Sequence, residues 1–144
     1  MGNKWPIVRL DEIAKNISRP FDLKGNDKAI FINTGDVLEG NFLHKQYSDT
    51  NGLPGLAKKA IRKGDILFSE IRPGNGRYAL VDFDETDEFV VSTKFMVLHV
   101  DEETIDLDFF YLQLTAPETL NEFQKIAESR SGTFPQITFD AVSH

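Results

Sequence analysis

Hydrophobic positions along the chain follow two spacings, one typical of helices and one typical of strands. Leu10, Ile13, Ala14 and Ile17 recur at intervals of three and four residues, which places them on one face of a short helix. The pattern ends before Pro20, where a helix is expected to stop. We therefore predict an amphipathic helix near the N-terminal end that packs by one face.

Short β-rich runs separated by turn residues follow this helix. Residues 29–33 have the composition of a strand, and the Thr-Gly-Asp triplet at 34–36 marks a turn. A shorter apolar pair comes before a second turn at residues 40–41, so this region is predicted to be strand, turn, strand. Residues 44–57 are polar and rich in Gly and Pro, which predicts a long ordered loop.

The central part of the chain contains three more strand patterns. Residues 66–71 and 77–83 flank the break Pro73-Gly74-Asn75-Gly76, and we expect these two strands to pair. Residues 88–100 form the longest strand pattern. Both of its alternating faces are largely apolar, so this strand is predicted to be covered on both sides.

Two helices joined by a tight corner are predicted next. Asp106 is placed to cap the first helix, whose apolar positions are Leu107, Phe110, Tyr111 and Leu114. Thr115 and Glu118 have the spacing of a capping box for the second helix, with Pro117 in its first turn. The apolar positions of that helix are Leu120, Phe123 and Ala127. It is expected to end by residues 131–132, and residues 133–139 are expected to be extended.

The order of these elements predicts an α+β fold with a curved, mainly antiparallel sheet and helices near both ends. Apolar residues make up 40% of the chain and charged residues 27%, which is typical of a folded protein. At 144 residues the chain is long enough for one substantial core. We therefore expect a single domain covering residues 1–144.

Several classes of protein are excluded by composition. No apolar run reaches the ~18 residues needed to span a bilayer, and the first ten residues do not resemble a secretory signal, so we expect a cytoplasmic protein without membrane association. The absence of cysteine excludes disulfide scaffolds, thiolate metal sites and thiol enzymes.

The charge is distributed unevenly along the sequence. The formal net charge is −7, which alone disfavours nucleic-acid binding. However, residues 82–108 contain ten acids and one base, whereas residues 56–78 contain six bases and two acids. This polarity is compatible with a basic binding surface, and equally with ordinary solvated surface. If DNA is bound, the acidic block is expected to lie away from it.

No motif for catalysis, cofactor binding or metal binding was found. The chain contains no phosphate-binding loop, no nucleophile elbow and no short metal-ligand spacing among its three histidines, of which His99 is expected to be a packed core or edge residue. Asp65, Glu70 and Arg72 could suggest a nuclease. Asp65 and Glu70 are five residues apart on a predicted strand, however, so they would point to opposite faces roughly 17 Å apart.

The candidate DNA-binding residues fall in three groups. Lys58, Lys59, Arg62 and Lys63 suit phosphate contacts, and Arg72, Asn75 and Arg77 on an exposed glycine-rich turn suit base edges. Such a tip could vary in chemistry without altering the fold, although an ordinary hairpin turn is an equally good interpretation. The third group, Arg130, Thr133 and Gln136, has similar chemistry.

Four motifs in order resemble the DNA-specificity (S) subunits of type I restriction-modification systems, and within them one target-recognition domain. The motifs are residues 5–13 (WPIVRLDEI), 31–37 (FINTGDV), 64–69 (GDILFS) and 132–142 (GTFPQITFDAV). Most of these residues are suited to turns and core, so they are scaffold rather than DNA contacts. The chain resembles one half of a specificity subunit, without the long helices that space two such domains.

The resemblance implies recognition of one half of a bipartite target in double-stranded DNA. The chain would be a non-catalytic component without a cofactor. The methyltransferase (M) subunit and, through the complex, the restriction (R) subunit would supply the chemistry. Two alternatives stay open: a protein-interaction module that docks on the methyltransferase without binding DNA, and a small metal-dependent nuclease. Salt-dependent DNA binding would argue against the first, and the absence of metal-dependent cleavage against the second.

Overall fold

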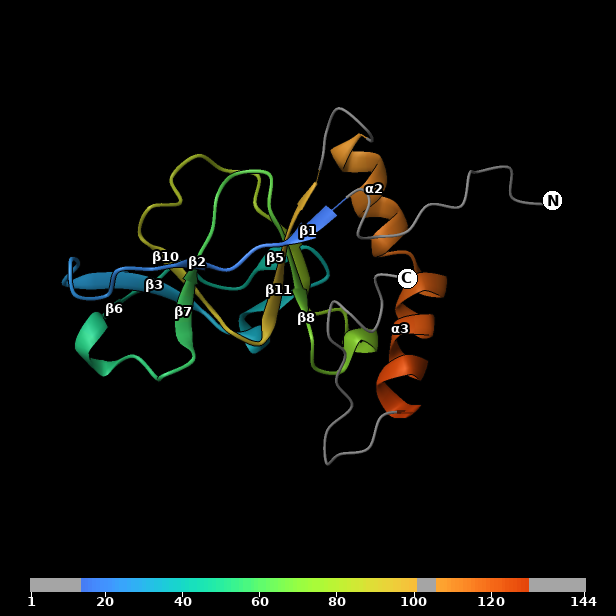
Figure 1. The fold of residues 1–144 in the computed structure, drawn as a ribbon, viewed down its shortest axis with the longest axis horizontal. Coiled ribbons are helices and arrows are strands. Elements are labelled where there is room, and N and C mark those ends of the chain that lie inside the picture. Colours follow the sequence, from blue (N-terminus) through green and yellow to red (C-terminus); the bar gives the residue numbers. More distant parts are fainter. Residues whose placement is uncertain (1–13, 101–105, 130–144) are drawn as a thin grey trace.

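The computed structural model describes residues 14–100 and 106–129, which form two sheets, a short hairpin and two helices. In Figure 1 a five-stranded sheet lies at one end, a four-stranded sheet lies in the middle, and both helices cover the other end. Residues 1–13, 101–105 and 130–144 lie outside this description. The first and last of the four motifs, at residues 5–13 and 132–142, therefore lie outside the described residues.

The five-stranded sheet has the order β2-β7-β10-β3-β6. Its strands are β2 (Arg19–Pro20), β7 (Ala57–Ala60), β10 (Phe89–Ser92), β3 (Lys28–Ile32) and β6 (Tyr47–Asp49). The β10–β3 pair is parallel and the other pairs are antiparallel. β3 is the strand predicted at residues 29–33.

The four-stranded sheet has the order β1-β11-β8-β9, and all of its pairs are antiparallel. Its strands are β1 (Ala14–Asn16), β11 (Phe95–Val100), β8 (Ile66–Ser69) and β9 (Tyr78–Leu80). The hairpin consists of β4 (Val37–Leu38) and β5 (Asn41–Phe42) and follows the 3-10 turn η1 (Thr34–Asp36). The predicted pairing of β8 with β9 is confirmed, as are the predicted turn after β3 and the short strand that follows it.

The prediction of a single strand over residues 88–100 is wrong, because the chain changes sheets in the middle of this segment. β10 belongs to the five-stranded sheet and β11 to the four-stranded sheet. The turn between them is stabilised by the Ser92 side chain, whose Oγ accepts a hydrogen bond from the Lys94 backbone N–H at 3.0 Å. The register of β10 against β7 also shifts between Val91 and Ser92. A serine side chain that satisfies local backbone groups competes with continuation of a strand.

The predicted N-terminal helix is also wrong where the structure describes it. Residues 14–16 form β1, which pairs antiparallel with β11, and the Ile17 N–H donates to the Val97 carbonyl at 2.8 Å. The Asn16 side chain accepts from the Val97 N–H at 3.2 Å. Pairing with a buried strand therefore overrides the local helical spacing, as tertiary context often does. Residues 10–13 lie outside the described part.

The predicted loop at residues 44–57 contains regular structure. β6 pairs with β3, and the 3-10 turn η2 (Thr50–Gly52) follows it. Thr50 is buried, and its hydroxyl lies 2.7 Å from the Asn26 carbonyl oxygen. This edge of the sheet was not recognisable from hydrophobic alternation, because all three β6 side chains are exposed.

Both helices lie in the C-terminal half of the described chain. The first, α2 (Leu107–Leu114), is capped by Asp106, whose carboxylate accepts from the Phe109 N–H at 2.9 Å, as predicted. The second, α3 (Pro117–Ser129), has Pro117 at its start. The predicted capping box at Thr115 is wrong, because the Thr115 hydroxyl donates to the Tyr111 carbonyl at 2.8 Å and Thr115 ends α2 instead.

The core is divided between the two sheets. One buried cluster joins the four-stranded sheet to the helices, and it includes Ile66, Phe68, Met96, Leu98 and Phe110. A second cluster fills the space where the two sheets meet, and it includes Ile32, Leu67, Val91, Phe95 and Val97. Because β8 and β11 contribute alternate side chains to both clusters, both of their faces are buried, as predicted for the second part of residues 88–100.

The α+β class and the mainly antiparallel strands are confirmed. Within the described residues, no helix is both long and apolar enough to cross a membrane.

We predict that Phe68→Ala lowers the free energy of unfolding by about 3–5 kcal/mol, because the ring is 1% exposed and its removal leaves a cavity. The ring packs edge-on against Phe123 of α3, with centroids 5.6 Å apart. Urea unfolding of the variant and the wild type would measure the difference. Leu112→Ala is the matched control, because Leu112 is 66% exposed and its truncation removes little buried contact. Equal losses in the two variants would contradict this assignment of the core.

Candidate nucleic-acid interface

The Asp65 carboxylate is buried and is contacted by two basic side chains and one backbone N–H. It is 0% exposed and precedes β8. Arg19 of β2 donates to it through Nη1 at 2.6 Å and Nη2 at 3.4 Å, and the Arg62 backbone N–H donates at 2.8 Å. The Nδ1 of His99 in β11 lies 3.4 Å from Oδ1. This carboxylate therefore fixes the position of a guanidinium and of the turn that carries a second arginine.

The exposed side chains of Lys15 and Arg62 extend the site around Asp65 to the surface. Lys15 of β1 lies directly opposite His99 in the antiparallel register, so the two side chains share one face. The side chains of Lys15 and Arg62 are exposed, and that of His99 is 53% exposed. We call Lys15, Arg19, Arg62, His99 and Asp65 the Asp65 cluster. It presents bases at the junction of the two sheets.

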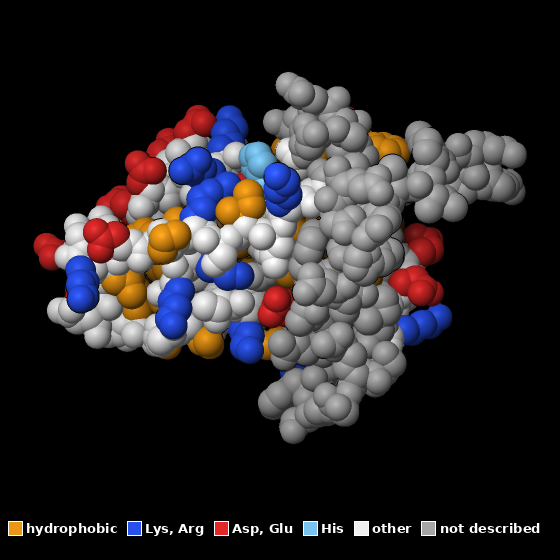
Figure 2. Space-filling model, viewed as in Figure 1, with side chains coloured by type: hydrophobic (Ala, Val, Ile, Leu, Met, Phe, Trp, Pro, Cys, Tyr) orange, Lys and Arg blue, Asp and Glu red, His pale blue; other side chains and the backbone are white. Residues whose placement is uncertain are grey.

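A groove runs beside the cluster along β2. Its lining residues are Ser18, Arg19, Pro20, Ala60, Ile61, Arg62, Thr86 and Asp87. Figure 2 shows Lys and Arg side chains gathered over and beside β2 and β7, with acidic side chains along the adjacent edge over the loop between β9 and β10. The basic and acidic parts of the sequence therefore meet here. Lys63 and Asp84 form an exposed ion pair at 3.4 Å.

Lys58 and Lys59 have different surroundings although they are neighbours on β7. Lys58 is exposed and lies where the register of β7 against β10 shifts, and its carbonyl accepts from the Phe21 N–H that follows β2. Lys59 is half-buried, and its Nζ donates to the Phe95 carbonyl at 2.7 Å. Lys58 is thus available at the surface near Arg19, whereas Lys59 joins the two sheets.

Burial changes the proton affinity of the groups around Lys59. Desolvation lowers the pKa of Lys59, and the nearby Glu70 carboxylate opposes that shift. Desolvation likewise raises the pKa of Glu70, against the attraction of Lys59 and Lys94. Glu70 therefore belongs to a group of its own, with Lys59 and Lys94, while Asp65 is engaged by Arg19. In the described part of the chain, no three His, Asp or Glu residues lie close enough together to hold a metal ion.

The turn from Arg72 to Arg77 is held at several points and is not a free tip. The 3-10 turn η3 (Pro73–Asn75) packs against α3, and the Gly74 N–H donates to Gln124 Oε1 at 2.9 Å. The Arg77 guanidinium donates through Nη1 to the carbonyls of Val37, at 2.9 Å, and Gly35, at 3.4 Å. The expectation that the whole turn could vary without altering the fold is wrong for Arg77. Arg72 and Asn75 remain exposed.

The predicted contacts are therefore not brought together as one group. Arg62 belongs to the Asp65 cluster, Lys58 lies near it and Lys63 is on the neighbouring turn. Arg72, Asn75 and Arg77 lie on the turn next to α3. The third predicted group, Arg130, Thr133 and Gln136, lies outside the described residues.

Sequence reasoning missed Lys15 and Arg19. Lys15 falls in the segment that was predicted to be helical, and Arg19 falls where that helix was predicted to stop. The usable signal was the Arg-Pro pair at 19–20, because Pro is compatible with a short edge strand. β2 is such an edge strand.

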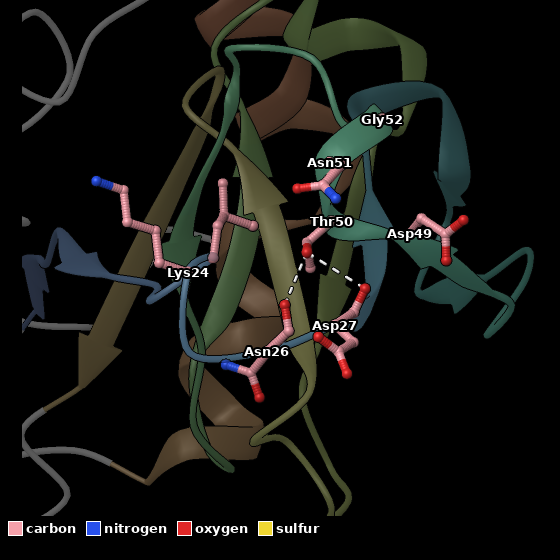
Figure 3. Close-up of a pocket in the computed structure, with 8 residues that line it drawn as sticks. Lys24, Asn26, Asp27, Asp49, Thr50, Asn51 and Gly52 are labelled. Carbon is pink, nitrogen blue, oxygen red and sulfur yellow. Dashed lines mark hydrogen bonds between the residues drawn. The ribbon is translucent and has the colours of Figure 1, made fainter.

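A second depression lies at the far end of the five-stranded sheet, between the loop before β3 and η2. It is lined by Leu23, Lys24, Asn26, Asp27, Asp49, Thr50, Asn51 and Gly52. Figure 3 shows the Thr50 hydroxyl directed at the carbonyls of Asn26 and Asp27, while Lys24 points away from this group. The lining is mainly carboxylates, amides and backbone oxygens, so it is poorly suited to an anionic ligand.

The sequence of this chain is similar to a known protein family and to a characterised relative. A family model described as the type I restriction modification DNA specificity domain matches residues 2–144. The chain is 57% identical over 139 residues to the type I restriction enzyme HindI specificity subunit of Haemophilus influenzae, an alignment that covers 96% of this chain and 30% of that protein. The chain thus spans about a third of the length of this relative.

Two solved structures have a similar fold. The HsdS subunit from Thermoanaerobacter tengcongensis matches with a TM-score of 0.77 and 23% identity, covering 94% of this chain and 35% of that one. A chain from a study of complex assembly and conformational transition of the type I R-M system matches with a TM-score of 0.74 and 22% identity, covering 95% and 35%. These similarities support the fold described above.

We predict that Arg19→Met destabilises the protein by about 3–5 kcal/mol, because it leaves the buried Asp65 carboxylate without its main partner. Adding Asp65→Asn to the Arg19→Met variant should recover part of the lost stability. The buried charge is then gone, and the amide oxygen can still accept from the Arg62 N–H. Chemical unfolding of the two single variants and the double variant gives the coupling energy. Additive losses would show that the pair is not coupled.

Proposed function

This chain belongs to the type I restriction modification DNA specificity family, and from this premise we propose that it recognises one half of a bipartite target in double-stranded DNA. It would act as a non-catalytic component in the cytoplasm, without a cofactor. A methyltransferase subunit and, through the complex, a restriction subunit would modify or cleave the DNA that it selects. Because the chain matches about a third of its relative, these partners are proposed for the whole subunit that such a domain serves.

The single observation that carries the DNA-binding proposal is the Asp65 cluster. Its buried carboxylate orients Arg19 and the turn carrying Arg62, and it leaves Lys15 and Arg62 exposed at the same junction. Bases held by a rigid scaffold lose less conformational freedom on binding than free side chains. Lys58, exposed on the strand that pairs with Arg19, extends the basic area. We infer that this area contacts phosphates.

The remaining predicted residues divide between contact and support. Lys63 is paired with Asp84 only at the exposed surface, and such pairs are weak, so Lys63 stays available to a phosphate. Arg72 and Asn75 are exposed on their turn and are proposed to reach base edges. Lys59 and Arg77 donate to backbone carbonyls and would act by holding the sheets and the turn in place.

The acidic loop beside the groove limits where DNA can lie. Asp87 lines the same groove as Arg62. Phosphates would be repelled from the Asp87 side of this groove, so we infer that the duplex approaches from the side of Lys15 and Lys58. The acidic block would then face away from DNA.

We predict that the chain binds duplex DNA weakly at low salt and that the affinity falls as salt rises, because phosphate contacts release counterions. Lys15→Ala and Arg62→Ala should each weaken binding to all sequences about equally and reduce the slope of log affinity against log salt by about one unit. Fluorescence anisotropy with labelled duplexes over a salt series would measure both quantities.

Lys24→Ala is the matched control for these variants. Lys24 is exposed beside the second depression, at the far end of the five-stranded sheet. It should leave the affinity and the salt slope unchanged. Absence of binding to any duplex at low salt, with methyltransferase present, would favour the interaction-module alternative over DNA recognition.

A further inference from the structure

Two exposed residues hold a left-handed backbone conformation that side chains other than glycine rarely adopt. Glu39 has φ +48° and Arg72 has φ +46°, and no other non-glycine residue in the described segments has a positive φ. Each lies in a turn that also contains a left-handed glycine, Gly40 at +92° and Gly76 at +77°. Such conformations are strained for residues with a Cβ, and strained residues tend to occur at functional sites.

The two turns are joined to each other by backbone contacts. The Glu39 N–H donates to the Gly76 carbonyl at 2.6 Å, and the Gly40 N–H donates to the Tyr78 carbonyl at 2.9 Å. A Cβ on Gly76 would lie 3.1 Å from Glu39 Cγ, so the stem of the glutamate passes directly over the glycine. We call residues 39–40 and 72–76 the paired turns.

Side chains of α2 and α3 contact the paired turns and hold them in place. Gln124 of α3 accepts from the Gly74 N–H, and Tyr111 of α2 places its hydroxyl 3.2 Å from the position that a Cβ on Gly40 would occupy. Arg77 binds the carbonyl of Val37 and so holds the β4–β5 hairpin against this site. The strained backbone is therefore held by surrounding structure.

Among the described residues, no partner of the Glu39 carboxylate explains why a glutamate occupies this position. The side chain is exposed, and its carboxylate makes no hydrogen bond or ion pair with residues 14–100 or 106–129. Glycine or asparagine would adopt the same backbone with less strain, and they are the residues usually found at this position of a two-residue hairpin turn. The backbone conformation of the turn thus disfavours glutamate. We take this as a sign that the Glu39 carboxylate has a role of its own.

We propose that Glu39 is a specificity-determining residue that accepts a hydrogen bond from the N4 amino group of a cytosine in the major groove. This inference rests on the proposed function. Among the base edges of the major groove, a carboxylate is best matched by the cytosine amino group, and it is repelled by phosphates. Arg72 and Asn75 on the adjoining turn carry donors for purine edges, so the paired turns would read neighbouring positions together.

The test is selection of duplexes from a random library with the 144-residue chain and its Glu39 variants. The wild type should select cytosine at one position of its target. Glu39→Gln should lose about tenfold of that preference and favour adenine there, because an amide pairs with the N6 and N7 edge of adenine. Glu39→Gly should lose discrimination at that position while its melting temperature is unchanged or higher, because the backbone strain is relieved.

Glu85→Gln is the matched control, since it makes the same change of charge at an exposed residue of the loop between β9 and β10. It should select the wild-type target. If folded Glu39→Gln and Glu39→Gly both select the wild-type target with unchanged cytosine preference, this inference is overturned while the proposed function stands. If the wild type itself enriches no sequence, the proposed function fails, and this inference with it.

Discussion

The arrangement of the two sheets depends on one buried carboxylate. Asp65 precedes β8 in the four-stranded sheet, and the guanidinium that it holds comes from β2 in the five-stranded sheet. A buried charge without a partner is strongly destabilising, so loss of Arg19 would weaken the junction between the two sheets. Lys59, which donates from β7 to the carbonyl of Phe95 in β11, makes a second connection across the same junction. The basic surface proposed to contact DNA is therefore built on the interactions that join the sheets.

In both candidate regions, the residues that hold the scaffold differ from the residues proposed to contact DNA. Around Asp65, Arg19 is mostly buried and holds the junction, whereas Lys15 and Arg62 are exposed. In the paired turns, Arg77 and Gln124 bind backbone groups, whereas Glu39, Arg72 and Asn75 are exposed. A recognition domain needs such a division, because side chains that read different targets can then change without loss of the scaffold. Charge alone did not distinguish the two roles, since Lys59 and Arg77 are Lys and Arg residues like the proposed contacts.

The sequence predicted those parts of the fold that are determined locally. β3, η1, β8, the β8–β9 pairing and the start of α2 follow from alternation, turn residues and the Asp106 cap. β1 could not be found this way, because its strand conformation depends on pairing with β11, more than eighty positions away. The change of sheet between β10 and β11 has only Ser92 as a local signal. In the same way, Arg62 was predicted as a contact from local charge, but its proximity to Arg19 depends on tertiary structure.

The central claim is that the surface around Asp65 is the face that binds DNA. Acetylation of lysines in the chain, with and without its selected duplex, tests this claim most directly, and mass spectrometry reads the modification at each residue. Lys15 and Lys58 should be protected by DNA, while Lys24, beside the second depression, should be modified equally in both samples. Unchanged modification of Lys15 and Lys58 in a sample shown to be bound would contradict this placement of the interface.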